Sequence, residues 1–389
     1  MPDNSAVLEW LAMKGPEMEE MLARVVGIDS GSHDPGGIEA VRMLFSHFFE
    51  EHGIDTVDID TAGGACLSAG IGSASNSGHI LMMGHMDTVF APGETGRRPW
   101  WVEEQEGKRL GRGPGCADMK AGLVMNAFIL AGFAVNGGAP APLRALYTRD
   151  EEIGSPNGRG AIEAEAAGAI AVFNAEPGRK NGNVVKARRG GTFFQATVTG
   201  RSAHAGLNPH EGRSAIEEMA RKILAWSALT SDEPDVTVSV GTVQGGQAVN
   251  MVAPSCTAQI DLRFAEAETG ARLETDIRDI AVTCAQDGLS GTLERRGGFL
   301  PIADGPENQT LVDLYIDVAR ELGHGIGAEF TRSCADSGFT ANMGVPTICG
   351  TGPVGGNAHS PEEYVELDSL APRAQVVAKS IMRLAESNR

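Results

Sequence analysis

The first half of the chain alternates short apolar runs with longer stretches of helical period. Residues 80–83 form a continuous apolar run ended by Gly84, which is typical of a strand buried on both faces of a sheet. The other predicted strands of this part are 54–59, 143–148 and 169–173. The predicted helices are 6–27, divided in two at Gly15-Pro16, 38–52, 120–135 and 159–167. This alternation predicts an α/β layer with helices on both faces of a sheet.

The pattern changes after residue 186. Residues 256–264 alternate apolar and polar side chains, as in a strand that covers a core with one face. The predicted elements here are strand 192–199, helix 214–229, strands 236–243 and 256–264, helix 266–284 and strand 291–295. This order, β-α-β-β-α-β, is that of a ferredoxin-like sandwich, so we expect an inserted domain at 187–295.

The first pattern then resumes with helix 308–322, a strand at 345–349 and helix 369–386. Residues 1–186 and 296–389 are therefore expected to form one discontinuous α/β domain around the insertion.

Composition narrows the function classes. The 389 residues contain 51 acidic and 32 basic side chains, a formal charge of −19, which argues against nucleic acid as a partner. The longest apolar stretch, 123–135, is too short to span a bilayer, so no membrane partner is expected. The polar start of the chain does not resemble a signal peptide, and six scattered cysteines without C-x-x-C fit a reducing compartment. We therefore expect a cytoplasmic protein.

The sequence Gly84-His85-Met86-Asp87 directly follows the predicted strand at 80–83. His85 and Asp87 are two residues apart, so on an extended backbone their side chains point the same way. In metal sites a His of this kind binds the ion, while a neighbouring carboxylate holds its other ring nitrogen. The alternative is a His and an Asp that satisfy each other near a turn.

Four further clusters of potential ligands follow predicted strands or lie in loops of the α/β part. They contain Asp118 in a glycine-rich loop, Asp150-Glu151-Glu152, Glu176 before Pro177, and His359 after Gly355-Gly-Asn-Ala. Carboxyl ends of strands in an open sheet face the crevice where ligands bind. Two His and three or four carboxylates that meet there would suit a pair of borderline divalent ions such as zinc.

Each cluster also has a simpler reading. Residues 150–152 are also typical of a solvated turn, and Asp118 of an N-cap for the following helix. Glu176 would then be only a loop residue, and His359 a surface residue. All of these readings would have to hold independently, whereas one shared metal site explains the set.

Taken together, these motifs resemble those of the M20 metallopeptidases, in particular the glutamate carboxypeptidase and acetylornithine deacetylase branch. The matching segments are GHMDTV at 84–89, GPGCADMK at 113–120, DEE at 150–152, EP at 176–177, SAHAG at 202–206 and AHS at 358–360. They occur in order over essentially the whole chain. The resemblance implies a mixed-sheet zinc-peptidase catalytic domain with an inserted ferredoxin-like α+β domain, which serves as a lid and forms a homodimer.

The resemblance also implies residue roles in a site with two Zn²⁺ per subunit, where Co²⁺ or Mn²⁺ could also serve. His85 and Glu176 would bind one ion, Glu152 and His359 the other, and Asp118 would bridge them, with Asp87 behind His85. Glu151 would be the general base for a water that bridges the ions, and then the acid for the leaving amine. A cis peptide bond is expected between Asp118 and Met119.

In the inserted domain, the resemblance assigns three residues to the substrate. His204 would reach the active site of the partner subunit and stabilise the oxyanion. Asn250 and Arg263 would hold the substrate carboxylate. The alternatives are a loop His that caps the helix after Gly212, and for Arg263 a solvent-facing strand residue.

The implied activity is hydrolysis of the amide bond of peptidyl or N-acyl amino acids, as in a glutamate carboxypeptidase. The segment 295–301 departs from that branch: its Arg register is shifted and Phe299 and Leu300 occupy part of it, so a preference for glutamate stays open. One alternative is a deacylase of the acetylornithine or succinyl-diaminopimelate type. The other is a non-catalytic metal- or ligand-binding homologue, which would not need Glu151.

Overall fold

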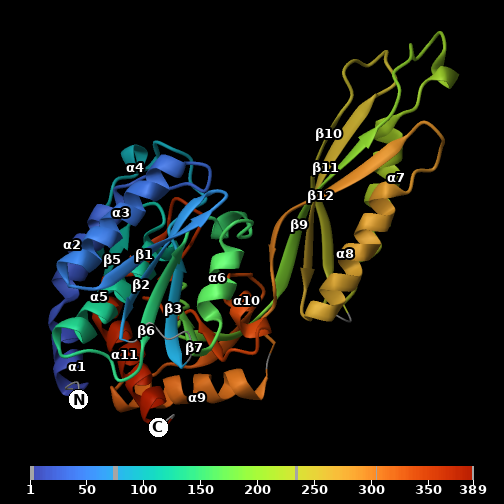
Figure 1. Cartoon of the computed structure of the whole chain (residues 1–389). Helices are drawn as coiled ribbons and strands as arrows, with labels where there is room; N and C mark the ends of the chain where they lie inside the picture. Colours follow the sequence, from blue (N-terminus) through green and yellow to red (C-terminus); the bar gives the residue numbers. More distant parts are fainter. Residues whose placement is uncertain (1–3, 73–77, 233–234, 304, 388–389) are drawn as a thin grey trace. The chain divides into compact units, whose positions relative to one another are not determined.

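The computed structural model of the chain describes residues 4–72, 78–232, 235–303 and 305–387 (Figure 1). The chain divides into two compact units. The larger unit consists of Met1–Ala187, Asp304–Thr331 and Phe339–Arg389, and the smaller one of Arg188–Ala303 and Arg332–Gly338. The larger unit is therefore discontinuous in sequence, and most of the smaller unit is inserted into it.

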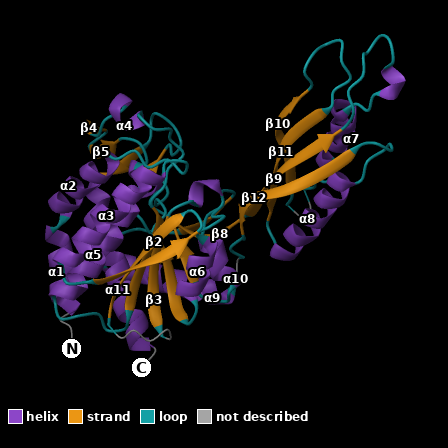
Figure 2. Ribbon diagram, turned by 45° about the horizontal axis from the view of Figure 1, so that its top comes forward, coloured by secondary structure: helices purple, strands orange, loops and turns teal. Residues whose placement is uncertain are grey.

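An eight-stranded mixed sheet forms the centre of the larger unit, in the order β1-β2-β6-β3-β7-β14-β8-β13 (Figure 2). Its strands are β1 (Asp55–Thr61), β2 (Gly64–Ile71), β3 (His79–His85), β6 (Leu143–Thr148), β7 (Ala169–Asn174), β8 (Val184–Arg188), β13 (Ala328–Thr331) and β14 (Thr347–Cys349). The neighbours β6, β3, β7 and β14 run parallel, whereas β1, β2 and β6 pair antiparallel. The carboxyl ends of β3, β6 and β7 therefore meet at one edge.

The helices of the larger unit are α1 (Asn4–Met13), α2 (Gly15–Val26), α3 (Pro35–Glu51), α4 (Glu94–Arg97), α5 (Ala121–Val135), α6 (Arg159–Ala166), α9 (Pro306–Glu321), α10 (Ser337–Asn342) and α11 (Leu370–Ser387). The start of α10 belongs to the smaller unit. Met82 of β3 belongs to the main hydrophobic core, and its neighbour Met83, which points to the opposite face, is also fully buried. Both faces of the sheet are thus covered, which explains the continuous apolar run at 80–83.

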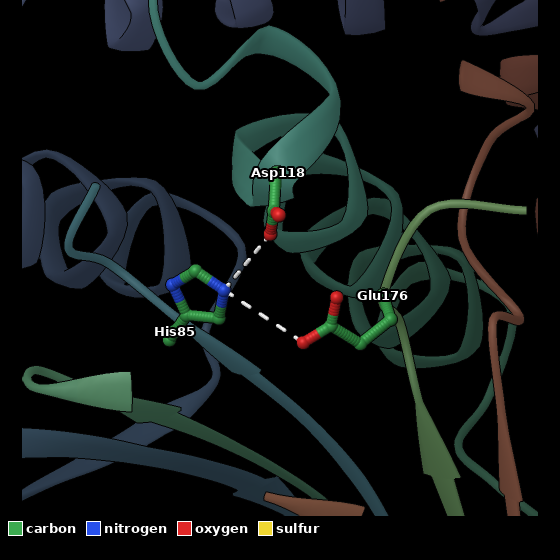
Figure 3. A group of neighbouring side chains, drawn as sticks. All are labelled: His85, Asp118 and Glu176. Atoms are coloured by element: carbon green, nitrogen blue, oxygen red, sulfur yellow. Dashed lines mark hydrogen bonds and ion pairs between the residues drawn. The ribbon is translucent and has the colours of Figure 1, made fainter. Parts of the chain in front are cut away.

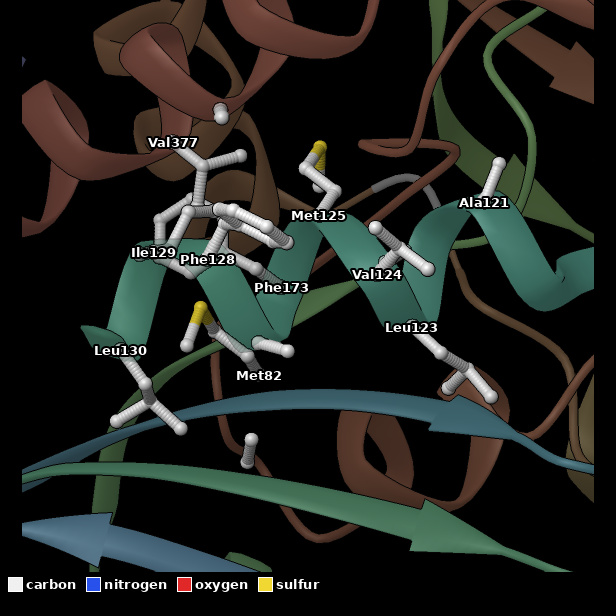
Figure 4. Close-up of a cluster of buried hydrophobic side chains, with 14 of the residues drawn as sticks. Met82, Ala121, Leu123, Val124, Met125, Phe128, Ile129, Leu130, Phe173 and Val377 are labelled. Carbon is white, nitrogen blue, oxygen red and sulfur yellow. The ribbon is translucent and has the colours of Figure 1, made fainter. Parts of the chain in front are cut away.

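Helix α5 is the central helix of the larger unit. In Figure 4 its residues Phe128 and Ile129 lie among Met82 of β3, Phe173 of β7 and Val377 of α11. The segment Cys116–Val135 is long and apolar enough to cross a membrane by length and composition, but 83% of its most apolar window is buried inside the protein. That burial identifies it as a core helix, as the sequence predicts.

A small four-stranded sheet in the order β15-β16-β5-β4 completes the larger unit. Its strands are β4 (Trp101–Gln105), β5 (Lys108–Arg112), β15 (Gly355–Gly356) and β16 (Tyr364–Glu366). Strands β15 and β16 pair antiparallel, so the segment between them is a turn that returns the chain beside itself. This turn carries His359.

The smaller unit has the strand order β10-β11-β9-β12, with every pair antiparallel. Its elements are β9 (Gly190–Thr199), α7 (Ala215–Ser227), β10 (Thr237–Gly245), β11 (Ser255–Phe264), α8 (Ala267–Val282) and β12 (Ser290–Phe299). A separate hydrophobic core joins the sheet to both helices through residues such as Trp226, Ile260 and Ile277. This is the ferredoxin-like order, and the predicted fold class of the whole chain is confirmed.

The structure differs from the predicted elements in several places. Strands β2, β4, β5, β8, β13, β15 and β16 are not among the predicted ones. For β2 the reason is composition: Gly64–Ile71 is rich in small residues that have little intrinsic strand preference, and its neighbours β1 and β6 hold it in the sheet. The inserted unit also ends later than residue 295, since β12 continues to Phe299, and it includes Arg332–Gly338.

Candidate metal centre and active site

Three ligand-type side chains from distant parts of the sequence meet at the edge where β3 and β7 end. His85 is the last residue of β3, Asp118 precedes α5, and Glu176 follows β7 (Figure 3). Nε2 of His85 lies 3.2 Å from Oδ1 of Asp118 and 3.7 Å from Oε1 of Glu176. All three point toward one another, as the sequence predicts for one metal position.

A second group shares Asp118 with the first. Nε2 of His359 lies 3.3 Å from Oδ2 of Asp118 and 3.2 Å from Oε2 of Glu152. In each group, one potential ligand atom per residue lies within 4.8 Å of the others. The two oxygens of Asp118 thus face different groups, which is the arrangement expected of a bridging carboxylate.

The packing of α5 brings these ligands together. A Cβ at Gly122 would overlap the carbonyl oxygen of Ala175, so only glycine lets the first turn of α5 approach the loop that carries Glu176. Asp118 is not the N-cap of α5, because the helix begins at Ala121, the cap position is Lys120, and no side chain donates or accepts a capping hydrogen bond there. The bond from Asp118 to Met119 is cis, as expected.

Asp87 contacts residues of both ligand groups without belonging to either. Its Oδ1 lies 3.3 Å from Nδ1 of His85, and its backbone oxygen is 2.9 Å from the same nitrogen. The carboxylate also accepts hydrogen bonds from Ser32 Oγ at 2.6 Å and from the backbone N–H groups of Glu151 and Glu152 at 3.1 and 3.2 Å. Asp87 therefore orients His85 and anchors the Glu151-Glu152 turn at the same time.

Residues 150–152 do not form a solvated turn, since Asp150 and Glu151 are buried. Asp150 shapes the loop by accepting hydrogen bonds from the backbone N–H groups of Asn157 and Gly158, at 2.7 and 3.0 Å. Oε2 of Glu151 lies 4.0 Å from Nε2 of His85. Glu151 and Glu152 are consecutive residues of a short 3-10 turn (Glu151–Ile153), and their side chains point in different directions. Glu151 approaches His85, and Glu152 approaches His359.

The close approach of these charged side chains shifts their pKa values. Burial alone would raise the pKa of Asp118, but hydrogen bonds with His359 and His85 hold it below its usual range. Burial and the charge of Asp118 raise the pKa of Glu152 to about 7. Hydrogen bonds with Asp118 and Glu152 raise the pKa of His359 to about 10. The carboxylates thus favour positive charge among them.

The donor set fits divalent cations. Oε1 of Glu152 is buried and has no hydrogen-bond partner among the described residues, which is costly for a carboxylate unless a cation or donor meets it. Two imidazoles and three carboxylates are ligands that suit zinc and its neighbours in the first transition row.

Two buried residues near Asp118 were missed by the sequence analysis. Glu363 accepts hydrogen bonds from the backbone N–H groups of Gly115, Ala117 and Asp118, and burial raises its pKa to about 7. Lys120 donates to the carbonyl of Ile28 at 2.7 Å, and burial lowers its pKa to about 8. The acidic pair at 362–363, shortly after His359, is the one sequence signal that could have drawn attention to Glu363.

His204 and Asn250 lie together in the smaller unit. Ala205 donates its N–H to the carbonyl of Asn250 at 3.0 Å, so the two segments run side by side. His204 does not cap the helix that follows, because the N-cap of α7 is Ser214, whose hydroxyl accepts from Glu217. Instead, Nδ1 of His204 accepts hydrogen bonds from the N–H groups of Gly206 and Leu207.

Arg263 lies in the same unit near the other end of β11. Strand β11 starts at Ser255, five residues after Asn250, and pairs Arg263 with Gly191 of β9 near its far end. The guanidinium is half-buried: it donates to Asp261 at 2.6 Å and to the sulfur of Cys334 at 2.7 Å. Within one chain, the structure therefore does not bring Arg263 together with His204 and Asn250.

A mixed sheet with potential metal ligands at its strand ends, in a chain that also contains a ferredoxin-like unit, is the architecture expected of a metal-dependent hydrolase. Peptidase family M20/M25/M40 matches residues 81–383. The chain belongs to this family and is a hydrolytic enzyme of the metallopeptidase class.

Individual relatives agree with this family. Carboxypeptidase G2 of Pseudomonas sp. (strain RS-16) is 26% identical over 393 residues, covering 95% of this chain and 89% of that protein. Among solved structures, the M20 family metallo-carboxypeptidase Sso-CP2 from Sulfolobus solfataricus has a TM-score of 0.74 at 16% identity, covering 95% of this chain and 99% of that one. A tripeptidase (SAV1512) from Staphylococcus aureus has a TM-score of 0.70 at 20% identity, covering 99% and 100%. The two structures share the fold of this chain.

Proposed function

We propose that this protein is a dinuclear zinc-dependent hydrolase that cleaves the amide bond of peptidyl or N-acyl amino acids, as a glutamate carboxypeptidase does. The observation that carries the proposal is the sharing of Asp118 between two ligand groups, with His85 and Glu176 on one side and Glu152 and His359 on the other. Similarity to carboxypeptidase G2 over almost the whole chain supports the substrate class.

In this proposal His85, Glu176 and Asp118 hold one ion, and Asp118, Glu152 and His359 hold the other. When bound, the ions would supply Lewis acidity, which polarises the scissile carbonyl and makes a water molecule more acidic. Zinc suits two imidazoles with three carboxylates, and Co²⁺ or Mn²⁺ could replace it.

Glu151 moves the proton. Its carboxylate faces the site, with Oε2 4.0 Å from Nε2 of His85, and its backbone is fixed by Asp87. It would accept a proton from the attacking water and then donate that proton to the nitrogen of the leaving amine as the C–N bond breaks. This role favours a hydrolase over a non-catalytic binding homologue, in which a buried carboxylate beside the ligands would have no task.

The smaller unit would bind the substrate. Because Nδ1 of His204 accepts two backbone hydrogen bonds, its Nε2 carries the proton in the neutral ring and can donate to an oxyanion. We propose that His204 serves the site of a partner subunit, and that Asn250 and Arg263 hold the substrate carboxylate. The separation of Arg263 from the other two within one chain supports contributions from two subunits.

We also propose a homodimer through the smaller unit. Strand β10 is an edge strand of its sheet, and the adjacent helix α7 exposes Ile216 and Leu224, whose side chains are 45% and 73% exposed. An open strand edge beside an apolar helix face is typical of a surface that pairs with a second copy.

The six cysteines are scattered along the chain without a C-x-x-C motif, which supports the proposal of a reducing, cytoplasmic location.

Metal analysis combined with a substrate panel tests the function. Purified enzyme should contain two ions per chain and release amino acids from N-acyl or peptidyl amino acids, with activity lost in chelator and restored by zinc. A panel of acyl-glutamates, other N-acyl amino acids, acetylornithine and succinyl-diaminopimelate separates a carboxypeptidase from a deacylase of the second type. Metal-loaded protein that hydrolyses none of these compounds would contradict the proposal.

A further inference from the structure

A buried carboxylate outside both ligand groups is bound by the loop that presents Asp118. Glu363, whose side chain is only 1% exposed, lies immediately before β16. Its Oε1 accepts hydrogen bonds from the backbone N–H groups of Ala117 and Asp118 at 2.9 and 3.0 Å, and its Oε2 accepts from Gly115 at 2.9 Å. The backbone of Asp118 is therefore attached directly to Glu363.

These backbone groups need an acceptor because they lie ahead of α5, which begins only at Ala121. Gly115 has a φ of 70°, and Asp118 is also outside the helical region, so the loop cannot satisfy all its N–H groups as a regular helix would. A carboxylate with two oxygens can accept all three hydrogen bonds, and charge-assisted bonds of this kind are stronger than neutral ones.

Glu363 also belongs to the turn that carries His359. The turn connects β15 to β16, and its backbone is closed by the N–H of Glu363, which donates to the carbonyl of Ser360 at 3.3 Å. Within the turn, the hydroxyl of Ser360 donates to the carbonyl of Asn357 at 2.7 Å. One residue thus fixes the loop of Asp118 through its side chain and closes the turn of His359 through its backbone.

We propose that Glu363 is a positioning residue for the metal centre. By holding residues 115–118 against the turn of His359, it sets the spacing between Asp118 and His359 and hence the affinity of the Asp118–Glu152–His359 group for its cation. It contacts neither substrate nor the reacting atoms. The inference rests on the proposed dinuclear function. It predicts a larger effect on this group than on the group with His85 and Glu176, because only this group depends on both segments.

The test compares Glu363→Gln with Glu362→Gln in the full-length protein. Glu362 is the adjacent residue, has the same chemistry, and is exposed. Metal-free protein is titrated with Co²⁺, and both the dissociation constants and the visible absorption of bound Co²⁺ are recorded. In Gln the side-chain oxygen still accepts hydrogen bonds, but the NH₂ group that replaces the second oxygen cannot, so the three bonds cannot all be kept. We therefore expect one of the two Co²⁺ ions of Glu363→Gln to lose about 10–100-fold in affinity, with an altered cobalt spectrum, while the other ion changes less. Glu362→Gln should behave as the parent.

Several outcomes separate this proposal from its rivals. Parent-like affinities and spectrum in folded Glu363→Gln overturn it, even if the variant melts at a lower temperature, since that would be a purely structural role. An equal loss in Glu362→Gln also overturns it. If Glu363→Gln does not fold, Glu363→Asp keeps the charge but is one methylene shorter, and it should show a smaller loss at the same ion; parent-like binding again overturns the proposal. If the parent itself binds no ion, the proposed function fails first and this inference with it.

Discussion

Oδ1 of Asp87 accepts a hydrogen bond from the backbone N–H of Glu151 at 3.1 Å, and the same oxygen lies 3.3 Å from Nδ1 of His85. One carboxylate therefore sets the direction of a candidate metal ligand and of the candidate proton carrier. In the sequence Asp87 reads only as the partner of His85. Its contact with the turn after β6 exists because β3 and β6 are parallel neighbours that end at the same edge.

We expect Asp87→Asn to weaken both metal binding and turnover. The amide nitrogen of Asn cannot accept the hydrogen bonds that one Asp87 oxygen now accepts, so His85 and the Glu151-Glu152 turn lose their common anchor. Changes of this kind behind a metal ligand lower affinity or activity about 10–100-fold. The loss is measured as a change in zinc affinity and in kcat/KM. The control is Asp60→Asn, on the exposed face of β1. Unchanged values for both quantities in Asp87→Asn would show that Asp87 has no such role.

Glu151→Gln separates metal binding from proton transfer. Gln keeps the size of the side chain but cannot carry a proton at neutral pH, so the variant should fold, retain its ions and lose activity. General acid–base catalysis by one group contributes roughly 10²–10⁴-fold, and a group that acts twice in one cycle should lie at the upper end of this range. Turnover of the parent and the variant is compared at equal metal content, with the exposed Glu104→Gln as the control. Retained turnover in metal-replete Glu151→Gln would refute the role.

The sequence predicts most of the site because its chemistry lies at strand ends. His85, Glu152 and Glu176 follow apolar runs long enough to be recognised as buried strands, so their convergence follows from parallel pairing. Asp118 and His359 come from irregular segments, and only their motifs indicate that they join. Glu363 escapes prediction because its function is to accept backbone N–H groups, and hydrogen bonds of that kind leave no periodic signal.

The fold shows the same division. Helix α5 and strands β3, β6 and β7 have clear apolar patterns and appear close to their predicted ranges. Strand β2 does not, since Gly64–Ile71 is rich in small residues and forms a strand only because β1 and β6 offer hydrogen bonds on both sides. Strand β12 extends beyond its predicted end at residue 295 for a related reason: two glycines, Gly297 and Gly298, interrupt its pattern, although pairing with β9 continues to Phe299.

The folded protein should lose stability as the pH falls, because of His79, a buried residue outside the metal centre. Burial lowers the pKa of His79 below its usual value of 6.5; Nε2 contacts the carbonyl of Glu165 at 2.8 Å, and Nδ1 has no hydrogen-bond partner among the described residues. As the pH falls below about 6.5, the unfolded chain binds a proton that the folded protein resists, so stability is lost. The charged groups around the ring are Arg144, which also disfavours protonation, and Glu165, which favours it.

Thermal unfolding between pH 5 and 7.5 tests this expectation. His79→Gln cannot titrate but can still donate to the carbonyl of Glu165, so its melting temperature should fall less steeply toward acid than that of the parent. Exposed His47 provides the control, because His47→Gln should keep the slope of the parent. Parallel pH profiles for the parent and His79→Gln would show that His79 does not contribute.

Leu224→Glu should convert the enzyme to monomers. Leu224 lies on the exposed side of α7, two turns beyond Ile216 and beside the open edge strand β10, so a charge there opposes pairing while leaving the core of the smaller unit intact. Sedimentation velocity at micromolar concentration should show a dimer for the parent and a monomer for the variant. Met13→Glu, at a comparably exposed apolar residue of the larger unit, should remain dimeric. Because His204 is proposed to act across subunits, kcat should fall together with the dimer fraction; a fully active monomeric parent would exclude both the dimer and that role of His204.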